Sequence, residues 1–258
     1  SFVEAAALEP SDLCTGNPCR IAQSFLVSED VLLDFGPATT LRFAPRVRAV
    51  LAPGVCLTVR AATIDLAQGS GARALGIGTG LRLEASMGYL RSDGRVVFKL
   101  RGADSLELSA AANSDLDVAV DVRSREEGTK GGDITIEAGG ALTVRGKINA
   151  SGEASGASSA AGGRLWMVAR GGALSSSAKI LVQSNSGPGG EIEMHSTGPM
   201  MIGGKLDLSA RREPGAGGAR SDIAARRRRR GRGRGSGPRV GAAVGAAVGA
   251  AVGAAVGA

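Results

Sequence analysis

Short stretches in which apolar and polar residues alternate recur along the chain between residues 20 and 210. In residues 116–122, a Leu and three Val share one parity, and two Asp and an Ala share the other. A period of two predicts a half-buried β-strand, because successive side chains of a strand point to opposite faces. The same reasoning predicts strands at 21–27, 31–35, 39–44, 48–52, 55–61, 63–67, 81–85, 95–100 and 105–110.

The connections between these stretches are short and contain no helical period of ten or more residues. A doubly wound α/β fold is therefore excluded, because its parallel strands need crossover helices. An antiparallel sandwich usually carries hairpin dipeptides such as Asn-Gly or Asp-Gly, and Asp93-Gly94 is the one dipeptide of that kind that fits. The remaining way to connect many short strands by short turns is a parallel solenoid.

Three glycine pairs mark a repeated unit within this region. The pairs lie 31 and 27 residues apart, and the differences in spacing fall in the segments 153–161 and 184–189. Insertions of this kind are typical of solenoids, which accommodate them at corners rather than in strands. The paired positions are Gly131 and Gly132, Gly162 and Gly163, and Gly189 and Gly190.

Alignment on the glycine pairs brings apolar residues into common columns. Stacked coils place such residues about 4.8 Å apart, and each buried Val, Leu or Ile contributes about 1.5–3 kcal/mol. Glycines at the corners would permit positive φ angles and let coils approach closely. The four columns are Ile134, Leu165 and Ile192; Ile136, Met167 and Met194; Leu142, Leu174 and Met201; and Ile148, Ile180 and Leu206.

The chain divides into four segments. Residues 1–19 are an entry segment, in which residues 1–13 form either a short helix ending before Pro10 or a linker. Residues 20–210 are the solenoid. Residues 211–239 lack apolar periodicity and are predicted to be disordered. Residues 240–258 repeat the motif GAAV and are predicted to be a low-complexity tail.

Composition supports a narrow core and places the charge in the tail. The 258 residues are 43% hydrophobic but 3% aromatic, with 41 Gly, as suits coils that contact only their neighbours. Residues 211–258 hold 11 Arg and two acidic residues, a charge of +9. The other 210 residues hold 20 basic and 22 acidic residues, a charge of −2. The net charge of +7 thus belongs to the tail.

The tail itself has two candidate activities. Its Arg-rich part, Arg226 to Arg230 with Arg232 and Arg234, would bind polyanions non-specifically. It has no interleaved aromatic residues and predicts no sequence-specific nucleic-acid recognition. The 19 uncharged residues of 240–258 are long enough to span a bilayer and carry a GxxxG ladder. Membrane anchoring or assembly is therefore an alternative to a low-complexity tail without a role.

The three cysteines differ in context. Cys14 and Cys19 stand in the tight loop CTGNPC, which allows a local disulfide in an oxidising compartment. Two free thiols are the alternative. Cys56 lies in a strand pattern and is predicted to be a buried, small apolar residue.

The segments NPCRI, VLLDFG, TTLRFAP and GGDITIEAGGALTVRGKINASG resemble those of bacterial exported repeat proteins, the filamentous-haemagglutinin-like and pectate-lyase-like right-handed β-helices. The resemblance covers about residues 14–210. It implies an all-β, right-handed parallel β-helix that is exported to the cell surface or secreted. It also implies a structural or adhesive role, with a polysaccharide or a protein as the surface ligand. The tail belongs to no such pattern.

Candidate chemistry is sparse, and no motif predicts a cofactor or a metal ion. The best carboxylate cluster is Asp115, Asp117 and Asp121, on one parity of a single strand. In pectate-lyase-like enzymes such outward carboxylates bind calcium or act as acid and base, whereas the plainer interpretation is a solvated strand face. Trp166 is predicted to face outward, either covered by segment 153–161 or contacting a partner. His195 also faces outward and has no Ser or Cys nucleophile in a motif context.

Three functions follow from these observations. The first is a non-enzymatic exported β-solenoid that acts as a surface spacer or adhesin. The second is a polysaccharide lyase or hydrolase that uses the face of Asp115, Asp117 and Asp121. The third is a binding module whose basic tail, 211–258, holds polyanions.

Overall fold

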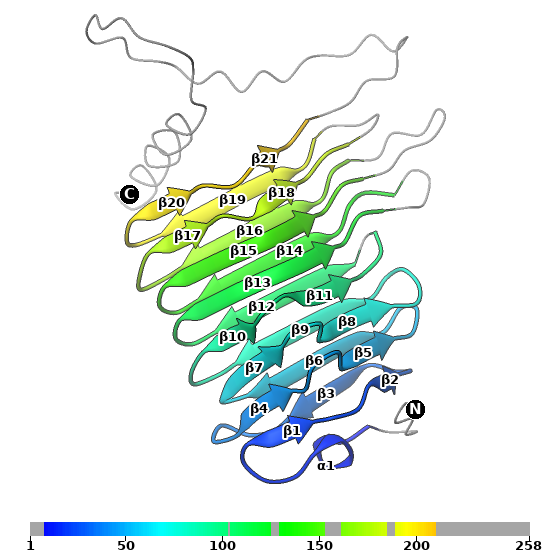
Figure 1. Cartoon of the computed structure of the whole chain (residues 1–258). Coiled ribbons are helices and arrows are strands. Elements are labelled where there is room, and N and C mark those ends of the chain that lie inside the picture. Colours follow the sequence, from blue (N-terminus) through cyan, green and yellow to red (C-terminus); the bar gives the residue numbers. More distant parts are fainter. Residues whose placement is uncertain (1–7, 103, 125–128, 153–160, 185–188, 210–258) are drawn as a thin grey trace, which may run out of the picture.

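The computed structural model describes residues 8–102, 104–124, 129–152, 161–184 and 189–209. The basic and GAAV segments, 211–239 and 240–258, and most of the predicted insertions lie outside these residues. Within them, a single short helix, α1 (Pro10–Leu13), precedes a stack of parallel strands (Figure 1). No helix of the described part is long and apolar enough to cross a membrane.

The strands form a parallel β-solenoid with three sides, and every strand pairing in the described residues is parallel. One side consists of β3 (Val31–Asp34), β6 (Cys56–Ala61), β9 (Gly80–Ala85), β12 (Ser105–Ala110), β14 (Asp133–Ala138), β16 (Arg164–Ala169) and β19 (Glu191–Ser196). We call this seven-stranded sheet the third side, because its strands come last in each coil. It confirms the all-β parallel solenoid predicted from the alternation of apolar residues.

The other two sides belong to one fourteen-stranded sheet. The first side consists of β1 (Cys19–Ile21), β4 (Thr40–Phe43), β7 (Thr63–Ala67), β10 (Leu90–Asp93), β17 (Leu174–Ser176) and β20 (Met200–Ile202). The second side consists of β2 (Phe25–Val27), β5 (Arg48–Leu51), β8 (Gly71–Ala74), β11 (Val96–Lys99), β18 (Lys179–Leu181) and β21 (Leu206–Asp207). The long strands β13 (Ser114–Asp121) and β15 (Leu142–Asn149) extend across both sides and join them into one sheet.

The core is a set of columns of inward side chains. Ile134 pairs in register with Leu106 on one side and Leu165 on the other, and all three side chains are buried. The predicted columns of Ile136 with Met167 and Met194, and of Ile148 with Ile180 and Leu206, are confirmed. Only partners of equal parity can stack, because a slip of one residue would turn a side chain outward.

One predicted column is wrong at its last member. Leu174 pairs with Met200, and Met201 pairs with Ser175. After the turn that follows β19, Met200 rather than Met201 takes the position that the glycine alignment assigned to the column. Met201 therefore points outward, and 63% of its surface is exposed.

The repeated glycine pairs are needed for close approach between coils. A Cβ atom at Gly163 would overlap the carbonyl oxygen of Gly132, and one at Gly190 would overlap that of Gly163. A Cβ at Gly131 would overlap the carbonyl oxygen of Ala150. A Cβ at Gly162 would overlap the backbone nitrogen of Gly190, and Gly189 lies beside these residues.

The expectation of positive φ angles at these pairs is wrong. Positive φ occurs at other glycines of the described residues, such as Gly94 at 80° and Gly146 at 97°. The glycine pairs lie just before stacked strands, where backbone of an adjacent coil fills the space that a Cβ atom would occupy.

Several strands and the entry segment differ from the sequence-based expectation. The strand expected over 21–27 is divided, because β1 ends at Ile21 and β2 begins at Phe25. The short strands β8 and β10 were not predicted, because the residues of β8 other than Arg73 are Gly and Ala, and β10 ends in polar residues. A short helix, α1, begins at Pro10, whereas most of the helix expected before Pro10 lies outside the described residues. Proline fits the first turn of a helix, where its missing N–H has no intrahelical partner.

Candidate functional site

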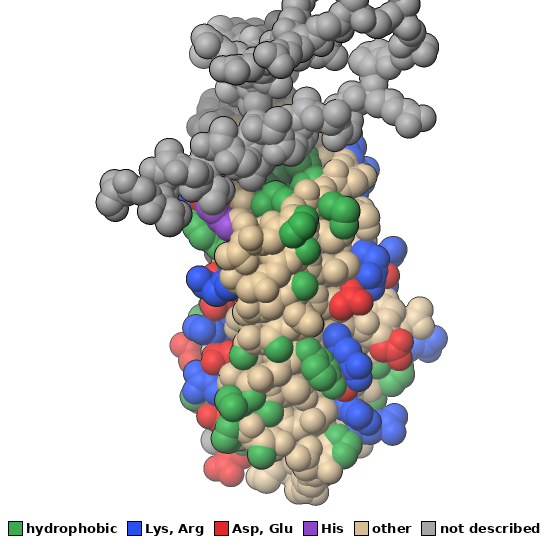
Figure 2. Space-filling model, turned by 90° about the vertical axis from the view of Figure 1, so that its left-hand side faces the viewer, with side chains coloured by type: hydrophobic (Ala, Val, Ile, Leu, Met, Phe, Trp, Pro, Cys, Tyr) green, Lys and Arg blue, Asp and Glu red, His purple; other side chains and the backbone are tan. Residues whose placement is uncertain are grey.

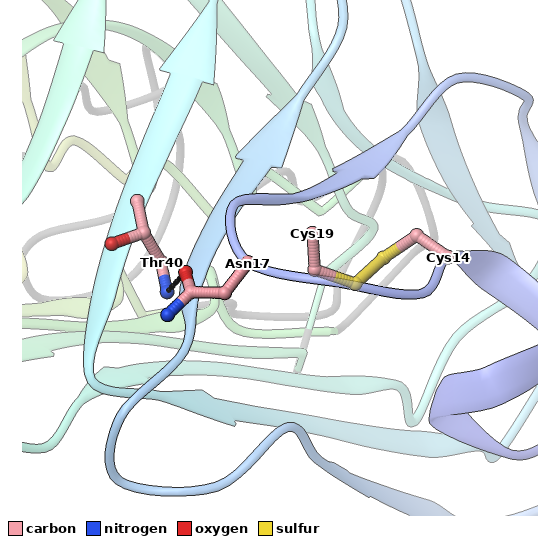
Figure 3. Close-up of a disulfide and its surroundings, with 4 residues drawn as sticks. All are labelled: Cys14, Asn17, Cys19 and Thr40. Carbon is pink, nitrogen blue, oxygen red and sulfur yellow. Dashed lines mark hydrogen bonds between the residues drawn. A yellow bond between two sulfur atoms is a disulfide. The ribbon is translucent and has the colours of Figure 1, made fainter.

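A disulfide ties the loop at the start of the solenoid. Cys14 and Cys19 are joined, with their Cα atoms 5.5 Å apart (Figure 3). Between them, the Asn17 side chain accepts a hydrogen bond from the Thr40 backbone N–H at 3.0 Å and donates one to the Ala38 carbonyl at 2.9 Å. The loop thereby pairs with backbone groups at the start of β4, at the edge of the first coils.

The candidate carboxylates Asp115, Asp117 and Asp121 all point outward from β13, as their parity predicted. Each one contacts an arginine. Asp115 lies 2.7 Å from Arg145, and Asp117 lies 3.3 Å from Arg95. Arg145 and Arg95 come from the neighbouring coils.

The arginine that contacts Asp121 is close to it in the sequence. Asp121 Oδ1 lies 3.1 Å from Arg123 Nε. Two-carboxylate cleavage of a glycosidic bond needs two carboxyl groups that flank the scissile bond, whereas each of these three carboxylates contacts an arginine. The described residues contain no group of three or more His, Cys, Asp or Glu that could hold a metal ion. The face of β13 is thus a row of ion pairs.

The outer face of the third side carries a similar ladder. Arg60 bridges Asp34 and Glu84 of the adjacent coils, at 3.7 and 3.2 Å. Arg82 bridges Glu84 and Glu107, at 3.6 and 3.3 Å. Figure 2 shows blue and red side chains side by side along the edges of the solenoid. Because parallel coils place residues of equal parity side by side, alternation of charge between coils stabilises the stack slightly.

The ladder continues to the last coils. Arg164 and Glu191 are Cα partners, and their side chains lie 2.6 Å apart. The hydrogen bond from Arg164 lowers the pKa of Glu191, and the pKa of Arg164 is raised in turn. Another ion pair between neighbouring coils joins Arg170 and Glu137, whose side chains lie 2.7 Å apart.

On the first side, one carboxylate serves two arginines. Asp65 lies 3.3 Å from Arg42 and 2.5 Å from Arg91, which belong to the coils before and after it. The hydrogen bond to Asp65 raises the pKa of Arg91. The hollow of about 700 Å³ lined by these residues also contains Arg20 and Asp93, so three arginines there face two carboxylates.

Trp166 is half-buried on the outer face of β16, at the predicted parity. Its ring stacks on that of His195 in the next coil, with 4.9 Å between ring centroids. His195 Nε2 lies 3.5 Å from Glu193. Segment 153–160, expected as one possible cover for Trp166, lies outside the described residues. The contact makes Trp166 and His195 a surface pair within the ladder.

Cys56 corrects a prediction, because it is exposed rather than buried. Its neighbours Leu57 and Val59 are the inward residues of β6. Residues of the opposite parity, Cys56 and Thr58, must therefore face outward.

Two of the three arginines that contact these carboxylates, Arg95 and Arg145, were not identified from the sequence. Arg95 lies 22 residues before Asp117, and Arg145 belongs to the strand paired with β13. Local patterns carry no signal for such contacts. Alignment of β13 with β15 would have revealed Asp117 opposite Arg145, but the glycine pairs define coils only from residue 131 onward.

No protein-family model, curated protein or solved structure matches the chain. The fold is accordingly established by the strand pairing described above.

Proposed function

We propose that this chain is a non-enzymatic, exported β-solenoid that acts as a structural or adhesive element at a bacterial cell surface. The observation that carries the proposal is the neutralisation of the best carboxylate cluster. Asp115 and Asp117 lie against arginines of the neighbouring coils, and Asp121 lies against Arg123 of its own coil, so none of the three is left without a cationic partner. A polysaccharide-cleaving enzyme that uses these residues is the alternative.

Two further features support export and a structural role. The disulfide between Cys14 and Cys19 fits an oxidising compartment, where such bonds form and persist. A solenoid in which each coil contacts only its neighbours forms a long surface with repeated polar faces, which suits a spacer or an adhesin. The resemblance to filamentous-haemagglutinin-like proteins agrees with both.

Surface exposure is tested on intact cells of the source organism. We expect proteinase K added from outside to degrade the chain while a cytoplasmic marker protein stays intact. We also expect Cys14 and Cys19 to resist alkylation by maleimide until a reductant is added, whereas Cys56 reacts at once because it is exposed. Protection of the chain until the cells are lysed, together with reactive Cys14 and Cys19, would contradict export.

A further inference from the structure

A groove on the second side of the solenoid departs from the balanced charges of the other faces. Its volume is about 290 Å³, and it runs across β5, β8, β11 and the end of β13. Two small or apolar residues, Ala74 and Leu100, complete its wall. Its charged lining consists of Arg48, Arg73, Lys99, Arg101, Arg123 and Asp121.

Five cations thus face one carboxylate. The single acid, Asp121, is engaged by Arg123 at 3.1 Å. The other cations form no ion pair within the described residues, in contrast to Arg42 and Arg91 of the first side and Arg60 and Arg82 of the third. Arg73, Lys99 and Arg101 are exposed. The groove therefore keeps an excess of positive charge.

The fold fixes the spacing of these cations. Arg73 and Lys99 are Cα partners in adjacent strands, and Lys99 is the Cα partner of Asp121. Arg101 and Arg123 each follow by two residues the end of their strands, β11 and β13. Neighbouring parallel strands lie about 4.8 Å apart, so Arg73 and Lys99 form a short row along the axis of the solenoid that ends at Asp121. Arg101 and Arg123 lie two residues further along the chain than Lys99 and Asp121.

We propose that this groove binds an acidic polysaccharide, a linear polymer whose carboxylate or sulfate groups lie along the row of cations. The inference deepens the proposed function and rests on it, because it assumes a chain that binds a surface polymer without cleaving it. Arginine pairs well with carboxylate and sulfate-like oxyanions, since its planar fork can donate two parallel hydrogen bonds. A row of fixed cations also gains from the release of counterions held by a linear polyanion.

The lining favours a polysaccharide over a nucleic acid. Single-stranded nucleic acids are held by aromatic side chains on which the bases stack, and no aromatic residue lines the groove. The disulfide at the start of the chain also fits a compartment outside the cytoplasm.

The test measures the groove locally, so that polyanion binding by residues 211–258 does not obscure it. The full chain is treated with an amine-acylating reagent, and modification of each lysine is followed by mass spectrometry. Polygalacturonate supplies carboxylates, dextran sulfate supplies sulfates, and dextran is the neutral control. At ten times the dissociation constant, acylation of Lys99 should fall about tenfold, because about a tenth of the sites stay free. Lys147 and Lys179, exposed Cα partners on β15 and β18, should react as before.

Two matched variants separate the groove from general charge. Arg73→Gln with Arg101→Gln should raise the polymer concentration that half-protects Lys99 by between about 2-fold and 30-fold. Lys147→Gln with Lys179→Gln removes the same charge outside the groove and should leave that concentration unchanged. Both sets replace exposed side chains, and an unchanged melting temperature will show that each variant folds.

Several outcomes would overturn the inference. One is that Lys99 is acylated equally with and without the acidic polymers. A second is that dextran protects Lys99 as well as they do. A third is that only an oligodeoxynucleotide protects it. Equal midpoints for the two double variants would do the same. The length of the polysaccharide is measured in the same samples. Shortened polymer with a protected Lys99 would refute the non-enzymatic function and leave the groove assignment intact, whereas intact polymer with an unprotected Lys99 would do the reverse.

Discussion

Replacement of Ile134 by Asp is expected to lower the free energy of unfolding by more than about 4 kcal/mol. Ile134 is 1% exposed and is stacked between Leu106 and Leu165. A carboxylate there has no partner and no access to water, and an unpaired buried charge is among the most costly changes a core can suffer. The loss should spread to the neighbouring coils, because each coil is stabilised by those on either side.

The same column contains a matched control. Ile192 is the Cα partner of Leu165 in β19, where it is only partly buried, because no described strand pairs with the far edge of β19. Ile192→Asp should cost about 1–2 kcal/mol, since its carboxylate can reach water. Urea denaturation followed by circular dichroism measures both variants. Equal losses at the two positions would contradict the placement of β19 at the edge of the stack.

Replacement of Asp104 by Ala is expected to cost about 3–5 kcal/mol, the sum for several donors left without an acceptor. Asp104 is 1% exposed, although it lies in a corner. Its carboxylate accepts hydrogen bonds from the Thr79 backbone N–H at 2.9 Å, the Thr79 hydroxyl at 2.5 Å and the Arg101 backbone N–H at 2.6 Å. These contacts join two successive corners, and Arg101 lines the basic groove.

The control for Asp104 is Asp115→Ala, which removes an exposed carboxylate with one ion pair. That change should cost less than about 1 kcal/mol. Thermal unfolding of both variants gives the comparison. A loss for Asp104→Ala no greater than that for Asp115→Ala would contradict the buried corner contact.

Asp104 also gives the corner a pH dependence. Burial raises the pKa of Asp104, in part offset by the hydrogen bonds from Thr79 and Arg101. Because the pKa of Asp104 is higher in the folded state than in the unfolded state, its protonation favours folding. This contribution to the free energy of unfolding is complete below the unfolded-state pKa and is lost as pH rises through the folded-state pKa. The lowered pKa of Glu191 acts in the opposite direction, because the contribution of its contact with Arg164 is lost as pH falls.

The inward face of the solenoid could be predicted because burial dictates a local pattern. Alternation in a stretch such as 116–122 follows from the pleat of a strand. The three glycine pairs recur because backbone from the next coil leaves no room for a Cβ atom. The one slip, Met201 for Met200, arose where a turn changed length, since the sequence carries no marker of where a short turn ends.

The outer face could not be predicted in the same way. The ion pair between Asp117 and Arg95 depends on the register between coils, which is set by turn lengths spread over many residues. The groove around Lys99 is assembled from four coils, and each of its cations looks ordinary in its own strand. Cys56 was misplaced because its apolar character was given more weight than its parity beside Leu57.

The absence of polymer cleavage by the ion-paired face of β13 is the expectation on which the proposed function depends. It is tested most directly by the molar mass of polygalacturonate, measured by light scattering after prolonged incubation with the full chain, with and without calcium. We expect the mass to stay unchanged with the natural sequence and with Asp117→Ala. A calcium-dependent fall in mass that Asp117→Ala abolishes would contradict the account and identify the face of β13 as an active site.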